Sequence, residues 1–427
     1  MFDIAYIRAN PDKVKLAAEQ KLMDVDIDRL LALDAEIRKF NFQIGTLRSK
    51  RNALSEEVKT AGKEEKQKII AQVKSIKDEL TPFEVEYDKV KSELDRLMLN
   101  VPSIPAPEVP IGRTDEDNIF VRAVGEIPTF DFPMKDHVEL ALLLELMDTE
   151  RAVKFAGSRS YFLKNEGMLL EMAITRFVID RLTAKGFTPM SVPLLVRDSA
   201  MTGTGYFPIG FEQAYKLPED ELFLIGTSEV SLVSYHQNEI LKREELPKKY
   251  AGYSTCFRRE AGTYGKDTRG LYRVHQFQKV EQVIICEADE SEMEALHVEI
   301  LNNSEEVLQA LELPYRIMLA CTGEIGIGQI KKHEIETWMP SRNAYCETHS
   351  CSSFGDFQAR RSNIKYRDKD GLAKYCYTLN NTGIASPRIF IPLLELNQQK
   401  DGSVKIPRVL WPYMGGMEVI KNKCTRQ

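Results

Sequence analysis

The sequence has no apolar run that approaches the roughly 20 residues a membrane-spanning helix needs. Its first residues, MFDIAYIRANPDKVK, carry charges inside the apolar stretch, so they lack the continuous apolar segment of a secretory signal. With 43% hydrophobic and 29% charged residues, the chain has the composition of an ordinary soluble protein. We therefore expect a cytoplasmic protein.

Cysteine is sparse and odd in number, with seven residues scattered between Cys256 and Cys424. They do not form the even, regularly spaced framework of a secreted disulfide scaffold, so reduced thiols are expected. Cys346, His349 and Cys351 resemble a set of metal ligands, but no second pair of matching spacing completes a four-ligand zinc site. Structural zinc is therefore the less favoured alternative to ordinary thiols.

The chain also lacks the GxxxxGK[ST] loop, so an ATP site, if present, must be built in another way. A net charge of −6 argues against a surface coated in basic residues for DNA, but it leaves room for a local basic patch. At 427 residues the chain is longer than a typical single domain, which favours two domains or one large domain with an appendage.

Two stretches near the N-terminus have the period of a coiled coil, with apolar residues recurring in alternating steps of four and three. The first seam, interrupted by one arginine, comprises Leu33, Ile37, Phe40, Ile44, Leu47, Arg51, Leu54 and Val58. The second comprises Ile69, Val73, Ile76, Leu80, Phe83, Tyr87, Val90, Leu94 and Leu97. Residues 60–63, TAGK, supply a tight turn, so an antiparallel helical hairpin on the order of 45 Å long is predicted.

The outer half of this hairpin is basic. Between Arg48 and Lys77 there are nine basic and four acidic residues, whereas acids outnumber bases from Asp78 to Arg96. This distribution favours contact between the tip and phosphate groups. A solvated coiled-coil surface of mixed charge is the alternative that the hairpin alone leaves open, and Arg51 serves either RNA contact or packing register.

A proline-rich segment follows the hairpin. Residues 101–110, VPSIPAPEVP, contain four prolines, which cannot continue a helix and favour an extended linker. The predicted organisation is an N-terminal domain over 1–100 with its hairpin at about 27–98, a linker over 101–112 and a larger domain over 113–427.

Two strand patterns flank a long loop in the larger domain. Residues 253–260, YSTCFRRE, place Arg258 and Glu260 on one face of a strand. Residues 277–285 place four side chains on one face, namely Phe277, Lys279, Glu281 and Val283. The loop over 261–276 is rich in glycine and arginine, and ordered loops of that length are usually functional. Its Arg269 and Arg273 suit phosphate or a nucleic-acid end; an exposed hairpin with incidental ion pairs is the alternative.

The segment CFRREAGTYGKDTRGLYRVHQFQKVE, residues 256–281, closely resembles the second signature motif of the seryl-tRNA synthetases of bacterial-like type, within the class II aminoacyl-tRNA synthetases. GFTPMSVP, 186–193, is similar to the first class II motif, which in the family forms the dimer interface. LNNTGIASPR, 379–388, with the apolar residues after it, is similar to the third. ETHS at 347–350 and FQARR at 357–361 resemble a further family element, and TSE at 227–229 resembles the serine-binding signature.

The resemblance implies roles for residues around an ATP molecule. It implies that Arg258 bridges the amino-acid carboxylate and the α-phosphate, a task suited to a guanidinium fork. It further implies that Glu260 reads the adenine amino group, Phe277 stacks on adenine, and Arg388 covers the other side or reaches the γ-phosphate. Glu347 and Ser350 resemble the positions that hold Mg²⁺. The full ATP-binding set implied is Arg258, Arg259, Glu260, Val274, Phe277, Glu347, Thr348, His349, Ser350 and Arg388, with Arg258, Glu260 and Arg388 catalytic.

For the amino acid, the resemblance implies that Glu281 and Thr382 bond the serine hydroxyl. The implied serine-binding set is Thr227, Ser228, Glu229, Arg258, Glu281 and Thr382, with Thr227 and Glu229 near the ammonium group. A site built around a hydroxyl rejects alanine because its polar groups would be left unpaired. Three features depart from the family's third motif: Asn381-Thr382 and Ser386-Pro387 replace other pairs, and Pro392 enters the following helix, where we expect it in the first turn.

Together these features predict an α+β protein, with a helical hairpin followed by the antiparallel sheet and flanking helices of a class II synthetase. The implied activity is ATP-dependent activation of serine and its transfer to serine tRNA, and also to selenocysteine tRNA where one exists. The implied partners are serine, a second copy of the chain and tRNA bound by the hairpin. Two alternative hypotheses remain: a ligase that loads an amino acid onto a carrier protein, and a catalytically inactive RNA-binding relative.

Overall fold

The computed structural model describes residues 2–262 and 269–422. The chain divides into two compact units, Met1–Ile104 and Pro105–Gln427, and the division falls inside the proline-rich segment. No helix in the described ranges is both long and apolar enough to cross a membrane.

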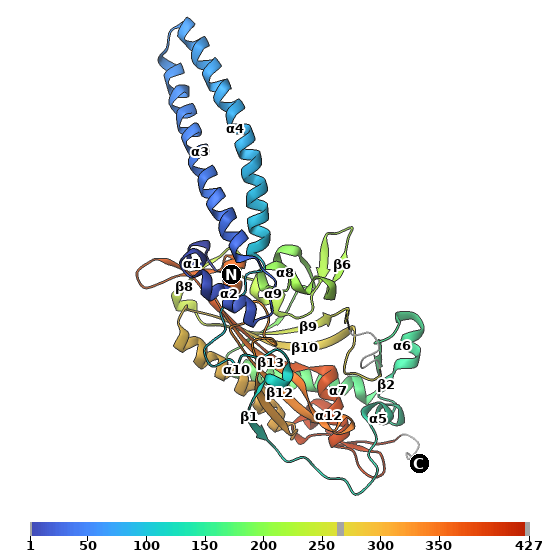
Figure 1. Cartoon of the computed structure of the whole chain (residues 1–427). Helices are drawn as coiled ribbons and strands as arrows, with labels where there is room; N and C mark the ends of the chain where they lie inside the picture. The colour runs from blue at the N-terminus through green and yellow to red at the C-terminus, as the bar shows by residue number, and fades with distance from the viewer. Residues whose placement is uncertain (1, 263–268, 423–427) are drawn as a thin grey trace. The chain divides into compact units, whose positions relative to one another are not determined.

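The first unit is entirely helical. Two short helices, α1 (Ile4–Ala9) and α2 (Pro11–Gln20), precede two long ones, α3 (Ile27–Thr60) and α4 (Lys63–Met98), which run side by side as a hairpin (Figure 1). Asp26 begins α3 by accepting a hydrogen bond from the Arg29 amide at 2.8 Å, as a helix N-cap does. The predicted hairpin is confirmed, including its turn at residues 61–62.

The hairpin is held together by the predicted seams. Leu33 is fully buried and Leu80 is 2% exposed, and the other apolar seam residues are buried or half-buried. Two ion pairs join the helices, Arg29 to Glu93 at 2.9 Å and Arg48 to Glu84 at 2.7 Å. Arg51, the polar interruption, is half-buried and donates to Asn52. Two members of the basic outer half are thus engaged within the hairpin, namely Arg48 and Lys59, which pairs with Glu56 at 2.6 Å.

The second unit is built on an eight-stranded sheet in the order β1-β11-β12-β13-β16-β10-β9-β4, antiparallel except for the β4–β9 pair. The strands are β1 (Ile119–Val124), β11 (Tyr315–Leu319), β12 (Lys331–Met339), β13 (Ala344–Gly355), β16 (Tyr377–Ala385), β10 (Gln276–Cys286), β9 (Lys248–Phe257) and β4 (Thr188–Ser191). This confirms the predicted antiparallel core. Strands β9, β10 and β16 lie at neighbouring positions, so the second and third motifs are brought together.

The two faces of β10 have different surroundings because side chains alternate along a strand. Val280 and Ile284 belong to the main core, which includes residues of α7 (Glu166–Ala184), α10 (Glu290–Ala310) and α12 (Ser386–Leu396). Val283, on the other face, joins a second core with α8 (Asp198–Thr204) and α9 (Glu229–Ser234). Helices α7, α10 and α12 thus cover one face of β10, whereas α8 and α9 pack near Val283 on the other face, where Phe277 and Lys279 line a pocket.

Smaller elements complete this unit. The helices are α5 (His137–Leu143), α6 (Thr149–Ala156) and α11 (Phe357–Ser362), and the 3₁₀ turns are η1 (Asp115–Asp117), η2 (Ile209–Gln213), η3 (Arg243–Glu245), η4 (Pro340–Arg342) and η5 (Arg408–Met414). The short strands are β2 (Met147–Asp148), β3 (Phe162–Leu163), β5 (Leu195–Arg197), β6 (Tyr215–Leu217), β7 (Leu222–Leu224), β8 (Ile240–Lys242), β14 (Lys365–Arg367), β15 (Ala373–Tyr375), β17 (Val404–Lys405) and β18 (Val419–Ile420).

The expectation for Pro392 is wrong. Helix α12 begins at Ser386, so Pro387 occupies the first turn and Pro392 lies in the helix interior, where it is buried. A proline there removes one amide donor from the helical ladder.

Candidate active site

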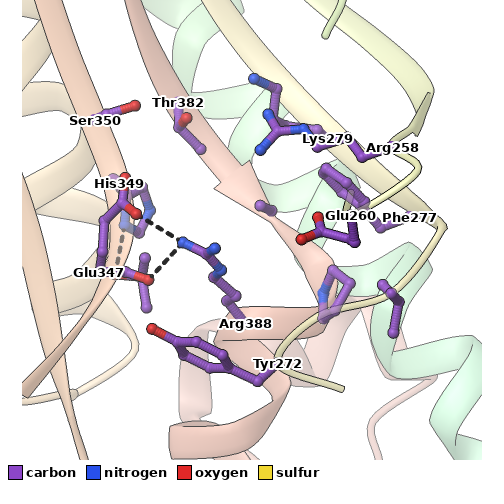
Figure 2. A pocket seen from close by; sticks show the side chains of 14 residues that line it. Arg258, Glu260, Tyr272, Phe277, Lys279, Glu347, His349, Ser350, Thr382 and Arg388 are labelled. Atoms are coloured by element: carbon purple, nitrogen blue, oxygen red, sulfur yellow. Dashed lines mark hydrogen bonds and ion pairs between the residues drawn. The ribbon is translucent and has the colours of Figure 1, made fainter. Parts of the chain in front are cut away.

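A pocket lies on the face of the sheet away from α10, and it encloses about 610 Å³, part of it open to solvent. Fourteen residues line it: Arg258, Glu260, Tyr272, Val274, Phe277, Lys279, Glu347, Thr348, His349, Ser350, Thr382, Ala385, Pro387 and Arg388 (Figure 2). They come from β10, β13 and β16, the first turn of α12 and the two ends of the loop after β9.

Arg258 and Glu260 lie beyond the end of β9, so the strand predicted over 253–260 is wrong in its last three residues. Pairing with β10 ends at Phe257. The Arg258 amide still donates to the His275 carbonyl at 3.0 Å, but the Arg259 amide turns away and donates to the Gln213 carbonyl of η2 at 2.9 Å. The Gln213 side chain also bonds both the amide and the carbonyl of Ala261. Glu260 consequently has a φ of +53°, and it still faces the pocket (Figure 2).

Arg258 and Phe277 form one wall of the pocket. The Arg258 guanidinium carbon lies 5.4 Å from the centre of the Phe277 ring, a cation–π contact, and its Nε donates to the Gly226 carbonyl at 3.3 Å. Glu260 is paired with Arg273 of the loop at 3.2 Å rather than with Arg258. The Arg258 guanidinium is therefore held at the pocket by aromatic and backbone contacts.

Arg388 forms the opposite wall. Its Nη1 donates to the Glu347 carbonyl at 3.1 Å and to the Glu347 carboxylate at 2.9 Å, as the dashed lines in Figure 2 show. Burial raises the pKa of Glu347, but the cations of Arg388 and Lys332 outweigh burial and hold that pKa below its ordinary value. The Arg388 guanidinium carbon also lies 5.0 Å from the centre of the Tyr272 ring. Glu347 is thus an ionised carboxylate at the mouth of the site.

A β-bulge sets the direction of the side chains on β13. Glu347 is paired with Glu336 of β12 and His349 with Ile335, so Thr348 is an extra residue on β13. Because of it, Glu347 and Ser350 both reach the pocket although they are three positions apart in the sequence. Two oxygen donors on one wall fit a hard divalent cation. His349 lies beside them, and burial lowers its pKa to about 4, so it is neutral.

The inner end of the pocket is a network of buried charges. Lys279 forms an ion pair with Glu281, and both are almost fully buried. Glu281 is the direct cross-strand partner of Thr382 on β16. Burial first, and the Glu281 carboxylate second, raise the pKa of Glu229 to about 7. Gln358 donates to Glu229 at 2.7 Å, so the FQARR segment supports this end.

The structure brings most of the predicted residues into this pocket and leaves others out of it. Thr227, Glu229 and Glu281 are not among the residues that line it. The Thr227 hydroxyl accepts from the Glu229 amide at 3.3 Å. Ser228 is fully buried and donates to the Gly252 carbonyl of β9 at 3.2 Å. Arg259 is exposed outside the pocket.

Four lining residues were absent from the predicted site: Tyr272, Lys279, Ala385 and Pro387. Lys279 was identifiable from strand alternation, because it shares its face with Phe277 and Glu281. Tyr272 lies in the long loop, and only the loop's length and composition marked it. Of the loop arginines, Arg273 reaches Glu260 while Arg269 pairs with Asp136 at 2.6 Å.

The described cysteines are free and buried. Within residues 2–262 and 269–422, no three His, Cys, Asp or Glu side chains form a group that would hold a metal by themselves.

Comparisons with known proteins cover both units. Residues 1–105 match the seryl-tRNA synthetase N-terminal domain, and residues 212–397 match the tRNA synthetase class II core domain (G, H, P, S and T). A serine–tRNA ligase of Deinococcus radiodurans is 46% identical over 420 residues, which are 98% of this chain and 99% of the relative. A second, from Dictyoglomus turgidum, is 42% identical, over 99% of this chain and all of the relative.

Solved structures are similar over the same extent. The crystal structure of seryl-tRNA synthetase from Pyrococcus horikoshii complexed with ATP has a TM-score of 0.89 and 38% identity, covering 99% of this chain and 100% of that one. Cytoplasmic serine–tRNA ligase from Naegleria fowleri in complex with AMP has a TM-score of 0.84 and 29% identity, covering 98% and 97%.

Proposed function

The chain belongs to the seryl-tRNA synthetase family, and from this premise we propose that it activates serine with ATP and transfers the serine to the 3′ end of serine tRNA. A serine carboxylate oxygen attacks the α-phosphorus of ATP, forming seryl-adenylate and releasing pyrophosphate. A hydroxyl of the terminal tRNA ribose then attacks the acyl carbon, and AMP leaves. The observation that carries this proposal is a pocket with opposed arginines, in a chain 46% identical over nearly its full length to a serine–tRNA ligase.

The ATP end of the pocket supports the first step. Two anions must approach each other, so preorganised cations lower the barrier. Arg258 would bridge the serine carboxylate and the α-phosphate, while Arg388 would meet the outer phosphates. Phe277, against which Arg258 packs, would stack on adenine, and Glu260, at the edge of the same wall, would accept from the adenine amino group.

Glu347 and Ser350 are the residues that would hold Mg²⁺. Their oxygens line one wall of the pocket, and phosphate oxygens of ATP would complete the coordination. The cation neutralises charge on the phosphates when it is bound. Arg388 already pairs with Glu347, so this carboxylate is kept ionised for a cation.

The charges at the inner end of the pocket suit the ammonium group of an amino acid. Lys279 neutralises Glu281, which leaves Glu229 to attract the serine ammonium, with Thr227 beside it. Glu281 and Thr382, cross-strand partners, would bond the serine hydroxyl. The methyl group of Thr382 would narrow the space and help to exclude threonine.

The helical hairpin would bind tRNA outside the anticodon, at its long variable arm, and the same contacts would admit a selenocysteine tRNA. Lys63 and Lys68 are exposed near its turn, where the positive charge is concentrated. A carrier-protein ligase has no use for such an arm, so the arm favours tRNA as the acceptor.

A second copy of the chain would bind at the first-motif region. Met168, Leu169 and Met172 of α7 are 44 to 55% exposed and form one apolar stripe. The nearby edge of the sheet is β4, and Tyr253, paired with Ser191 of β4, is also exposed. An open strand edge beside apolar side chains favours pairing with another chain. We expect a homodimer in the cytoplasm.

Deleting the hairpin separates the two steps. A variant lacking residues 30–97 retains the whole second unit, so it is expected to keep serine-dependent pyrophosphate exchange and to lose charging of serine tRNA. Unchanged charging by this variant would show that the arm does not serve tRNA binding.

A further inference from the structure

The loop that carries Tyr272 is anchored by a histidine outside the pocket. His137, the first residue of α5, is 8% exposed, and its Nε2 lies 3.3 Å from the Leu271 amide nitrogen. Leu271 directly precedes Tyr272. On its other side, the His137 Nδ1 lies 2.8 Å from Oε1 of Glu395, which is fully buried in α12.

These contacts define the tautomer of His137. A backbone amide can only donate, so Nε2 must accept from Leu271 and carries no proton. The ring proton therefore resides on Nδ1 and is donated to Glu395. The His137 amide donates to the same Glu395 oxygen at 2.9 Å, so the ring and its helix are fixed by one carboxylate.

Glycine at position 270 permits this approach. A Cβ at Gly270 would lie 2.2 Å from the His137 Nε2, and the residue has a φ of +82°. The chain therefore requires glycine at this position to bring the Leu271 amide to the ring. Arg269 pairs with Asp136, which caps α5, and secures the same stretch of loop.

Glu395 also holds turn η4, which packs against Tyr272. Its Oε2 accepts from the Ser341 amide at 2.9 Å, in turn η4. The next residue, Arg342, places its guanidinium carbon 4.1 Å from the centre of the Tyr272 ring. Arg388, on the same helix as Glu395, also packs against Tyr272. One buried carboxylate thus joins α5, α12 and η4 around the aromatic ring at the pocket mouth.

We propose that His137 and Glu395 are positioning residues that set the affinity for ATP by holding Leu271, and therefore Tyr272, against the arginines at the phosphate end of the pocket. This inference rests on the proposed function. It predicts that loss of the acceptor at Nε2 weakens the binding of ATP but not of serine, because the residues proposed to bind serine lie on β10, β16 and α9.

Three substitutions at one position separate this role from general packing. In His137→Gln the side-chain amide oxygen can take the place of Nε2 and accept from Leu271, whereas His137→Asn retains a donor toward Glu395 and is too short to reach Leu271. His137→Ala loses both. His236 provides the control, because it is also buried and bonded to a glutamate, Glu239, at 2.7 Å, but it contacts Tyr250 instead of the loop.

The experiment is pyrophosphate exchange by the full chain, with KM measured separately for ATP and for serine. For His137→Asn and His137→Ala we expect the ATP KM to rise about tenfold, the effect of one lost buried hydrogen bond. Their serine KM should stay within about twofold of the wild-type value. Gln should restore the ATP KM, and His236→Asn should not alter it. Equal ATP KM values for Gln and Asn, or a parallel rise in both constants, would overturn the proposal.

Gly270→Ala provides a test from the loop side if the histidine variants do not fold. It leaves the sequence of α5 unchanged but places a Cβ against His137 and Val138, so the loop and the ring cannot keep their contact. It should raise the ATP KM alone; an unchanged ATP KM would contradict the proposal. Exchange by the wild-type chain is the reference, and its absence would mean that the proposed function is wrong. If the wild type is active but the His137 and Gly270 variants keep its ATP KM, only the role of His137 is rejected.

Discussion

Glu229 is buried within electrostatic reach of Glu281, and the two carboxylates have one buried lysine, Lys279, near them. Because Lys279 pairs with Glu281, Glu229 bears the cost of a second buried negative charge. Burial and Glu281 raise its pKa to about 7. In the proposed function, the serine ammonium would be the cation that compensates Glu229.

The first prediction concerns pH and serine binding. Below pH 7 Glu229 is protonated and cannot attract the ammonium, whereas above pH 7 it is ionised. The serine KM should therefore rise as the pH falls through 7, with a limiting slope of about tenfold per pH unit. Pyrophosphate exchange between pH 5.5 and 8.5 measures it at saturating ATP. Glu229→Gln should raise the serine KM and abolish the slope; a slope that persists in this variant would assign the titration to another group.

The second prediction concerns the pocket's size limit. Thr382→Ser keeps the hydroxyl opposite Glu281 and removes one methyl group. Exchange with threonine relative to serine should increase by about tenfold, since one methyl in a pocket is worth roughly 1–3 kcal/mol. Relative kcat/KM values for the two amino acids measure it. If the ratio stays constant, threonine is excluded elsewhere in the pocket.

The third prediction concerns the pairing of Arg388 with Glu347. Arg388→Ala removes a cation from the phosphate end, and we expect exchange to fall by about 100-fold or more, the size of effect seen when one preorganised donor is removed from a reaction centre. Glu347→Gln should raise the Mg²⁺ concentration needed for half-maximal exchange. A Mg²⁺ titration that is the same in wild type and Glu347→Gln would remove Glu347 from the cation site.

The fourth prediction concerns the hairpin turn. Replacing Lys63 and Lys68 with alanine should weaken tRNA binding and reduce its log–log dependence on salt by about one to two, because each phosphate contact contributes just under one. Serine-dependent exchange should be unaffected. The matched control replaces Lys89 and Lys91 of α4, which pair with Glu86 and Asp95 within the helix. An equal loss of tRNA affinity in both double variants would mean that the charge near the turn has no special role in tRNA binding.

Much of the fold follows from local patterns in the sequence. The heptad seams, with Leu33 and Leu80 buried as their spacing predicts, determine the hairpin without long-range information. Strand alternation likewise predicts that Phe277 and Lys279 face the pocket together. Both periodicities are properties of neighbouring residues, so a sequence displays them directly.

Features that depend on distant partners were not predictable from such patterns. The end of β9 is set by Gln213, which lies 46 residues before Arg259 and captures its amide. The bulge at Thr348 follows from pairing with β12, and alternation alone would place Glu347 and Ser350 on opposite faces. The bond between His137 and Glu395 spans 258 positions. Neither residue was among those that the sequence motifs assigned to ATP binding.

Pyrophosphate exchange by the purified full chain, with serine, alanine or threonine as the amino acid, tests the central claim most directly. We predict Mg²⁺-dependent incorporation of labelled pyrophosphate into ATP with serine, and little with alanine or threonine, because the residues proposed at the inner end of the pocket would bond the serine hydroxyl and attract its ammonium group. No exchange with serine, or equal exchange with alanine, would contradict the account.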